Sequence, residues 1–313
     1  MEKALQHITG VLPPDYQPRY KRLLFNEDRH RALQSNKAWQ SFYLLNTKNK
    51  RLLAEFHACK VENEMLCPAK GPFAGLEFDQ RLSQERLHNF VHFISENVRK
   101  EASGLVVKPR PAAYDPSHFS REVYAWLSNG FQVVTQEIHG MVNTNEIDIS
   151  DILAGSEVNR LNKCRNAGYK FSKCAPGEYG KIHQHTLKCR EERGQRLSMS
   201  EAQLGELIGT FPDKVWLFSV RNGAELIATA ICILVKKDVL YNYSHAHGMD
   251  YDDHSPVVFL MDGLYRYCQK NGIKIIDVGS SSLNHSPNFP LLAFKERLGA
   301  DLSIKLQLEK KFS

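Results

Sequence analysis

An alternation of apolar and polar residues between residues 216 and 246 is the feature that most constrains how this chain folds. The alternation is interrupted at Asn222-Gly223 and again at Lys237-Asp238. Residue pairs such as Asn-Gly form the tight turns that connect neighbouring antiparallel strands. The sequence therefore predicts a three-stranded meander, with strands at residues 216–221, 226–236 and 240–246.

Segments with helical spacing lie on both sides of this meander. Gly168 and Gly272 end two of them, because glycine readily adopts the left-handed conformation that closes a helix. We expect helices at residues 157–167, 178–193, 200–208 and 256–270, a short strand at 169–172, and a strand, a helix and a final strand after residue 274. This order predicts an α/β domain built on a mixed sheet.

The N-terminal half contains a similar but weaker set of signals. Residues 41–46 and 51–60 are expected to form a hairpin, and Ser83 is expected to cap a helix that ends near Lys100. A chain of 313 residues is long enough for two domains with their own cores. We place the boundary in the polar stretch 143–148, which gives domains at residues 1–148 and 149–313.

Two short motifs in the second half resemble those of a known family. Residues 294–300 read Phe-Lys-Glu-Arg-Leu-Gly-Ala and follow a strand and a serine-rich loop, and residues 159–168 form a basic segment that ends in Gly168. These motifs resemble the C-terminal signature and the basic helix of FemAB-like acyltransferases, a branch of the GNAT superfamily. The resemblance implies two tandem GNAT-like domains with mixed α/β sheets.

The same resemblance implies an enzyme that forms an amide. The expected reaction transfers an acyl or aminoacyl group to an amine of an anionic acceptor, such as a cell-envelope or polysaccharide precursor. Aminoacyl-tRNA and acyl-CoA are the donors that the family suggests, and neither is a tightly held cofactor. Two alternatives remain: an acyl-CoA-dependent N-acetyltransferase with an atypical CoA site, and a GNAT-fold protein that binds without catalysis.

The loop at residues 248–255 distinguishes between these donors. Acetyl-CoA enzymes carry a glycine-rich loop here, whose N–H groups hold the pyrophosphate at a helix N-terminus. This chain has Asp250, Asp252 and Asp253 and a single glycine, Gly248. Each carboxylate would repel a nearby pyrophosphate by about 1 kcal/mol or more. The loop therefore argues against CoA without excluding it.

The strand before this loop carries two catalytic candidates. Acyl transfer to an amine needs a proton acceptor and a proton source near the acyl carbon. By alternation, one face of the strand is expected to carry Tyr241, Tyr243, His245 and His247. We name Tyr243 and His245 as catalytic candidates, although a hydrogen-bonded structural histidine is the alternative for His245.

The FemAB-like motif adds a third candidate, Lys295, which by resemblance contacts charged parts of the substrates. Phe289, Leu292, Phe294 and Leu298 are expected to face the core, so that Lys295 emerges at the side of the helix. A solvated surface lysine is the alternative. Ser280, Ser281 and Asn288 lie in the polar loop before this helix and are expected either to bind substrate or to cap the helix.

Positive charge is concentrated in one segment, although the whole chain carries only +6. Residues 160–196 hold ten Lys and Arg against three Glu. Such a segment favours an anionic ligand or, alternatively, forms a solvated helix face. Arg160, Lys163 and Arg165 are the expected phosphate contacts, and tRNA is a further partner that this charge would suit.

The remaining features exclude several other classes of protein. No apolar run approaches the ~20 residues of a membrane helix, and the start of the chain lacks a signal-peptide pattern, so we expect a cytoplasmic protein. Seven cysteines without a Cys-x-x-Cys pair argue against disulfides and a structural zinc site. His245 and His247 with Asp250, Asp252 and His254 resemble a metal cluster, but the chemistry needs no metal and we expect none.

Overall fold

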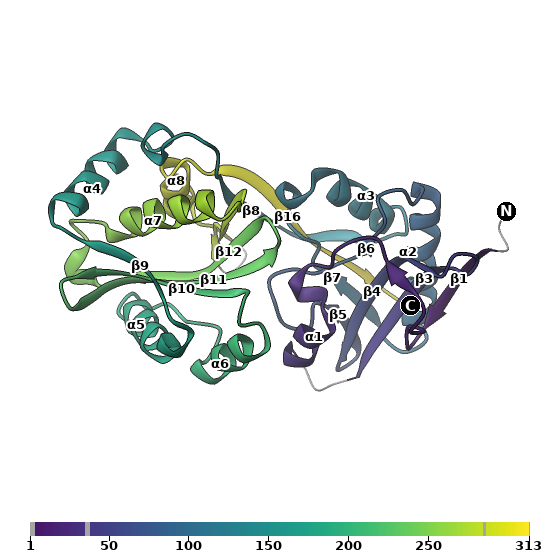
Figure 1. Cartoon of the computed structure of the whole chain (residues 1–313). Coiled ribbons are helices and arrows are strands. Elements are labelled where there is room, and N and C mark those ends of the chain that lie inside the picture. The colour runs from purple at the N-terminus through teal and green to yellow at the C-terminus, as the bar shows by residue number, and fades with distance from the viewer. Residues whose placement is uncertain (1–3, 35–37, 284–285, 313) are drawn as a thin grey trace. The chain divides into compact units, whose positions relative to one another are not determined.

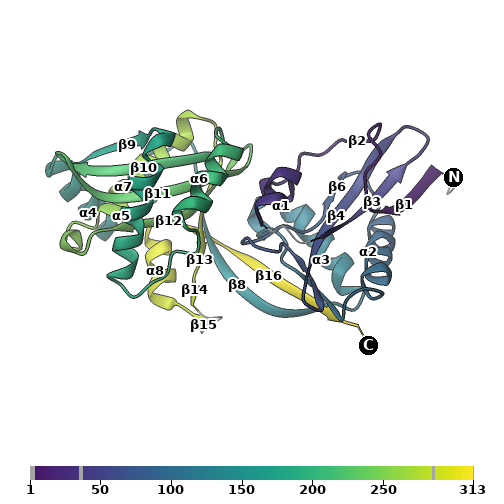
Figure 2. The same cartoon turned by 90° about the horizontal axis from the view of Figure 1, so that it is seen from below.

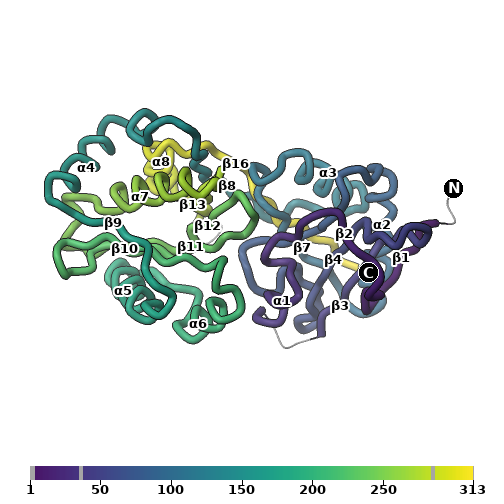
Figure 3. The backbone as a smooth tube through the Cα atoms, viewed as in Figure 1, coloured from purple at the N-terminus to yellow at the C-terminus, as the bar shows by residue number. Residues whose placement is uncertain are grey.

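The computed structural model describes residues 4–34, 38–283 and 286–312, which form two compact units (Figure 1). The first unit comprises Met1–Glu137 and Ser303–Ser313, and the second comprises Ile138–Leu302. The end of the chain thus belongs to the first unit, and its path can be followed in yellow in Figure 3.

In the structure the two units divide between Glu137 and Ile138. The sequence predicts the boundary later, within the polar stretch 143–148. This stretch is held against a helix of the second unit. The hydroxyl of Tyr265 donates to Asn145 Oδ1 at 2.7 Å, and the amide of Gln269 donates to the carbonyl oxygen of Ile147 at 3.0 Å. The polar residues 143–148 therefore form a loop that hydrogen bonds hold in place. The chain passes from the first unit to the second within the strand Gln132–Asn143.

The first unit contains a sheet with two long helices. Its strands are β1 (Leu5–Thr9), β2 (Gln17–Pro18), β3 (Trp39–Asn46), β4 (Arg51–Val61), β5 (Glu64–Cys67), β6 (Glu77–Phe78) and β7 (Gly104–Val107), and its helices are α1 (Asp28–Gln34), α2 (Gln84–Val98) and α3 (Pro116–Leu127). The predicted hairpin is formed by β3 and β4, and Ser83 caps α2 by accepting a hydrogen bond from Arg86 N.

The second unit contains the predicted meander and the helices around it. Its strands are β8 (Gln132–Asn143), β9 (Lys170–Cys174), β10 (Val215–Asn222), β11 (Glu225–Lys236), β12 (Val239–His247), β13 (Ile275–Ser280), β14 (Ser282–Leu283) and β15 (Ser286–Pro287). Its helices are α4 (Gly155–Asn166), α5 (Tyr179–Glu191), α6 (Glu201–Thr210), α7 (Pro256–Lys270) and α8 (Phe289–Arg297), and β16 (Asp301–Lys311) ends the chain.

The strands of each unit form a mixed part of the sheet. In the first unit the order is β1-β3-β4-β5-β7-β16, with β5 parallel to β7. In the second unit the order is β8-β13-β12-β11-β10-β9, with β12 parallel to β13 and the other pairs antiparallel. Helices α4 and α7 lie on one face of this second sheet, and α5 and α6 lie on the other (Figures 1 and 2). The predicted α/β fold class with tandem mixed-sheet domains is confirmed.

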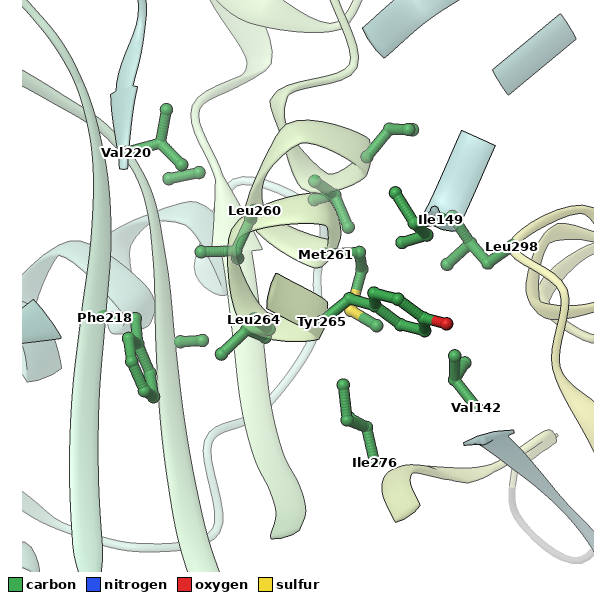
Figure 4. Close-up of a cluster of buried hydrophobic side chains, with 14 of the residues drawn as sticks. Val142, Ile149, Phe218, Val220, Leu260, Met261, Leu264, Tyr265, Ile276 and Leu298 are labelled. Atoms are coloured by element: carbon green, nitrogen blue, oxygen red, sulfur yellow. The ribbon is translucent and has the colours of Figure 1, made fainter. Parts of the chain in front are cut away.

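Helix α7 forms the centre of the second core (Figure 4). Its Leu260 and Leu264 lie on the side of Phe218, while Met261 and Tyr265 lie on the side of Ile149. The helix also approaches β9 closely, because a Cβ on Gly263 would lie 2.2 Å from the ring of Phe171. This packing fixes α7 against β10, β11 and β12, the strands that carry the candidate site. None of the helices that the structure describes is long and apolar enough to span a bilayer.

Candidate functional site

The two central parallel strands of the second unit separate after a short region of pairing. β12 and β13 pair at Val239–Ile275, Leu240–Ile276 and Tyr241–Asp277. Over the described length of the two strands no further pair joins them, although β12 continues to His247 and β13 to Ser280. The end of pairing at Tyr241 and Asp277 therefore leaves the following backbone groups of two neighbouring strands outside their shared ladder, and we take this point as the centre of the candidate site.

A bulge in β12 lies next to this point. Ser244 pairs with Ile231 of β11, and Asn242 pairs with Cys232, which leaves Tyr243 as an additional residue between two rungs. A bulge of this kind bends a strand and changes the direction of the side chains that follow it.

The bulge makes one sequence prediction wrong. Tyr241 pairs with Ile233, and His245 pairs with Ala230, three residues away along β11. Residues an odd number apart on a strand point to opposite faces. Tyr241, Tyr243, His245 and His247 therefore do not share one face, because regular alternation across residue 243 was assumed.

Tyr243 lies on the side of α5. Its hydroxyl is hydrogen bonded to Ser198 Oγ at 2.7 Å, and its ring contacts that of Tyr241 with centroids 6.4 Å apart. Burial raises the pKa of the Tyr243 phenol, so this hydroxyl is protonated at neutral pH. Tyr243 is therefore suited to donate a proton and unsuited to accept one.

His245 lies on the opposite face and has a structural hydrogen bond. Asn242 Nδ2 and His245 Nδ1 are 3.1 Å apart, and this contact spans the bulge. Burial lowers the pKa of His245 to about 3, with the positive charges of Arg190 and Lys295 adding to the effect. A neutral imidazole with this pKa is a weak base at pH 7. The geometry thus favours the structural alternative for His245, and its catalytic role remains a prediction.

Lys295 is buried, contrary to the expectation that it emerges at the side of α8. Its side chain is 3% exposed, and Nζ donates to the carbonyl oxygens of Gly279 at 2.8 Å and Ser280 at 2.7 Å. The stem lies over Gly140 of β8, where a Cβ would be 3.1 Å from Lys295 Cδ. The absence of a side chain at Gly140 thus makes room for a lysine that binds the end of β13.

Among the apolar residues of α8 that were expected to face the core, Phe294 and Leu298 do so, whereas Phe289 does not. Phe289 is 69% exposed, since it is the first residue of the helix and extends beyond the core. Leu298 is buried, and Phe294 packs against the core. The helix therefore contacts the core through its C-terminal part.

The polar loop before α8 mainly holds itself together. Asn288 caps the helix, with Oδ1 accepting from Leu291 N at 3.1 Å. Ser280 Oγ accepts from Ser282 N at 3.2 Å. Ser281 is buried, and its Oγ has no hydrogen-bond partner in the part of the chain that the structure describes. Capping accounts for Asn288, while substrate contacts by Ser280 and Ser281 remain predictions.

The three basic residues of α4 lie at a distance from Tyr243 along the fold, since α4 packs on α7. Arg160 Nη1 lies 2.9 Å from Glu157 Oε1, and Arg165 Nη2 lies 3.4 Å from Asp262 Oδ1. Lys163 is exposed. Their predicted phosphate contacts are untested, and two of the three already have carboxylate partners.

Arg190 of α5 is a candidate that the sequence did not single out. Its Nε donates to Ser244 Oγ at 3.0 Å, beside the bulge, and Nη1 donates to Gln195 Oε1 and to the carbonyl oxygen of Arg196, each at 3.4 Å. Within the described ranges, no carboxylate forms an ion pair with it. Burial lowers the pKa of this guanidinium, but an arginine remains charged at neutral pH.

A half-buried cation with only neutral partners is suited to bind an anion. One signal in the sequence could have identified Arg190: in the helix expected over residues 178–193 it lies four residues after Thr186 and eight after Ile182, both of which are buried in the structure. This position on the apolar face of the predicted helix distinguishes Arg190 from the exposed basic residues of the same segment.

The acidic loop before α7 is partly neutralised. Asp252 Oδ1 lies 2.6 Å from Arg193 Nη2 and 2.8 Å from His247 Nε2. Asp250 and Asp253 are exposed. No group of three or more residues suited to hold a metal ion is found in the ranges 4–34, 38–283 and 286–312.

Residues 178–285, which include α5, the meander, α7 and β13, match the family model described as "Acetyltransferase (GNAT) domain". No curated protein matches the chain. Among solved structures, the crystal structure of FemX matches with a TM-score of 0.68 and 11% identity, covering 92% of this chain and 92% of that chain.

Two further structures have a similar fold. The C-terminal domain of a putative lysylphosphatidylglycerol synthetase from Agrobacterium fabrum matches with a TM-score of 0.57 and 10% identity over 82% of this chain and 81% of that one. L-PGS from Bacillus licheniformis matches with a TM-score of 0.57 and 11% identity over 89% and 85%. At these identities the similarity establishes the fold, that of GNAT-type acyltransferases.

Proposed function

We propose that this chain, which carries a GNAT domain at residues 178–285 and has the fold of FemX, transfers an acyl or aminoacyl group to an amine of an anionic acceptor. The proposal depends on three structural features that lie next to one another in the second unit. The strands β12 and β13 separate after Tyr241, a bulge follows at Tyr243, and Arg190 lies against that bulge.

Each feature has a role in amide formation. Strands that separate offer backbone N–H groups that stabilise the negative oxygen developing on the acyl carbon. Arg190 binds the anionic part of the acceptor and so holds its amine near that carbon, which supplies much of the acceleration in reactions of this kind. Tyr243 gives a proton to the leaving group, and Lys295 keeps the end of β13 in position.

Aminoacyl-tRNA is the donor that we favour. Asp250 and Asp253 are exposed at the start of α7, where a CoA pyrophosphate would have to bind. The resemblance of the motifs at residues 159–168 and 294–300 to those of FemAB-like enzymes, some of which take an amino acid from aminoacyl-tRNA, supports this donor. The acceptor that fits Arg190 is a phosphorylated or nucleotide-linked precursor of the cell envelope or of a polysaccharide, in the cytoplasm.

The second candidate is an acyl-CoA-dependent acetyltransferase, and one observation favours it. The matching family model is that of an acetyltransferase, and it spans the whole loop at residues 248–255. Pairing of Asp252 with Arg193 also removes one of the three repelling carboxylates. A non-catalytic binding protein is the third candidate.

The test combines binding with transfer. The purified chain is titrated calorimetrically with acetyl-CoA and with a nucleotide-diphosphate sugar. The same sugar carrying an amine is then incubated with the chain and, in separate reactions, with a mixture of radiolabelled aminoacyl-tRNAs or with radiolabelled acetyl-CoA. Label in an alkali-stable amide product, without CoA binding, is the expected result. Micromolar binding of acetyl-CoA with label transferred from it would replace the proposal by the second candidate. Binding of the sugar without any transfer would favour the third.

A further inference from the structure

His139 of β8 is buried and, among the described residues, has no hydrogen-bond partner. The residue is 1% exposed, and in the part of the chain that the structure describes neither Nδ1 nor Nε2 forms a hydrogen bond. A buried polar group left in this condition costs about 1–3 kcal/mol, and folded proteins retain few such groups. The position therefore calls for an explanation other than packing.

The neighbour of His139 is a buried carboxylate. His139 Nδ1 lies 3.4 Å from Asp277 Oδ1, and Asp277 is 0% exposed. Asp277 Oδ1 also accepts from Gly279 N at 2.6 Å, which fixes the orientation of the carboxylate. A histidine beside an oriented carboxylate is the arrangement that stabilises an imidazolium when the ring takes up a proton.

This pair lies where β12 and β13 separate. Asp277 faces Tyr241 in the last rung that joins the two strands. The pairing of β13 with β8 is interrupted between Asp277 and Ser280, and it resumes at His139, which pairs with Ser280. Gly279, with φ at +78°, permits the irregular turn of the backbone between them.

We propose that His139 is the proton acceptor for the attacking amine, directly or through one water molecule, with Asp277 as the group that stabilises its protonated form. This inference rests on the function proposed above. The first proton leaves the substrate ammonium for His139 and passes to solvent. The lone pair of the amine then forms the C–N bond with the acyl carbon, and the bond from that carbon to the donor oxygen breaks. Tyr243 protonates the leaving oxygen and regains a proton from the amide nitrogen.

The other charged groups near His139 are already engaged. Lys295 crosses over the adjacent Gly140 and donates to the carbonyl oxygens of Gly279 and Ser280. Glu137, two residues earlier on β8, is paired with Lys305 at 2.7 Å. From β12, Tyr241 faces the pair through its rung with Asp277. Asp277 thus supplies a carboxylate 3.4 Å from Nδ1 of His139, where its charge would stabilise a proton taken up by the ring.

The test compares His139→Gln with His183→Gln. His183 is a matched control, since it is also buried in the second unit, at 5% exposure, but its Nε2 is hydrogen bonded to the carbonyl oxygen of Met199 at 2.9 Å. Single-turnover transfer from aminoacyl-tRNA is followed as a function of pH, with and without added imidazole. Thermal unfolding and calorimetric titration with the acceptor show that each variant is folded and binds.

For His139→Gln we expect a rate lower by about 10²–10⁴-fold, loss of the decline in rate at acid pH, and partial recovery with imidazole. His183→Gln should keep the pH profile of the parent protein. A folded His139→Gln variant with the parent rate and profile would overturn the assignment and leave the proposed function standing. A parent protein that transfers nothing from any donor would overturn both. If His139→Gln does not fold, His139→Asn is measured in the same way and decides the question.

Discussion

The ammonium group of Lys295 donates a hydrogen bond to the carbonyl oxygen of Gly279 at 2.8 Å, which joins α8 to the irregular end of β13. A second bond, to Ser280 at 2.7 Å, fixes the next residue. Asp277, the carboxylate that faces the separating strands, lies only two residues before Gly279. Lys295 therefore stabilises the site indirectly, by holding the backbone of Gly279 and Ser280 in place.

Replacement of Lys295 should consequently affect stability as well as turnover. Lys295→Met removes the ammonium donor from two half-buried carbonyl groups, and we expect a loss of about 1–3 kcal/mol in the free energy of unfolding. Lys163→Met, at an exposed position of α4, should change it by no more than about 0.5 kcal/mol. Urea denaturation measures both. Equal midpoints for the two variants would show that the contacts of Lys295 contribute nothing to the fold.

Arg190 and Arg160 should respond differently when their charge is removed. Arg190→Gln removes a cation that has no carboxylate partner among the residues the structure describes. We expect affinity for a nucleotide-diphosphate sugar to fall by about tenfold or more, with a weaker dependence on salt. Arg160→Gln removes a cation that is paired with Glu157 and should leave affinity within about twofold. Calorimetric titration at low and moderate salt separates these outcomes. The reverse order would move the anion site to α4.

The pKa of His245 determines how the chain responds to acid. The folded-state pKa, about 3, lies below the ordinary value of 6.5, so between these limits the unfolded state binds the extra proton and stability falls as the pH is lowered. His245→Asn should remove part of this decline, by up to about 1.4 kcal/mol for each pH unit. The pH dependence of transfer should stay unchanged.

Urea midpoints of the parent protein and His245→Asn between about pH 7 and 4 measure the effect on stability. Parallel curves would show that His245 is protonated in the folded state. A changed pH–rate profile in the variant would instead restore His245 as a proton acceptor and count against the neutral state found in the structure.

Regular periodicity is what made most of the fold predictable. The meander, α2 and α7 follow from spacings of two and of three to four residues, and the structure places them within a few residues of the expected bounds. The bulge at Tyr243 was not predictable, because a single extra residue leaves no mark on composition and yet reverses every side chain after it.

Burial of charge was the second limit. Lys295 was expected at the surface because an isolated lysine is rarely buried, but two carbonyl groups at the end of β13 and the bare backbone of Gly140 accommodate it. No sequence pattern identified His139, because its proposed role depends on the carboxylate of Asp277, 138 residues away in the sequence. Such sites form only when strands that are distant in the sequence pair, and local sequence patterns do not predict which strands pair.

Glu55 of the first unit allows an independent test of the structure. Its carboxylate is 0% exposed, Arg22 donates to both of its oxygens at 2.5 and 2.8 Å, and His57 Nε2 lies 3.3 Å away. Burial alone would raise the pKa of Glu55, but the hydrogen bonds from His57 and Arg22 outweigh it and lower the pKa to about 2. The carboxylate therefore stabilises the folded state above its ordinary pKa, 4.5, and this contribution is lost as the pH falls towards 2.

Glu55→Gln should accordingly destabilise the first unit by about 3 kcal/mol at neutral pH, and the difference from the parent protein should shrink as the pH is lowered below about 4.5. Glu85→Gln, at an exposed position of α2, serves as the control and should change stability by less than about 0.5 kcal/mol. Urea unfolding followed at several pH values measures both. A difference for Glu55→Gln that stays constant down to about pH 3 would contradict the lowered pKa, because the parent carboxylate would then take up its proton over the same pH range in the folded and unfolded states.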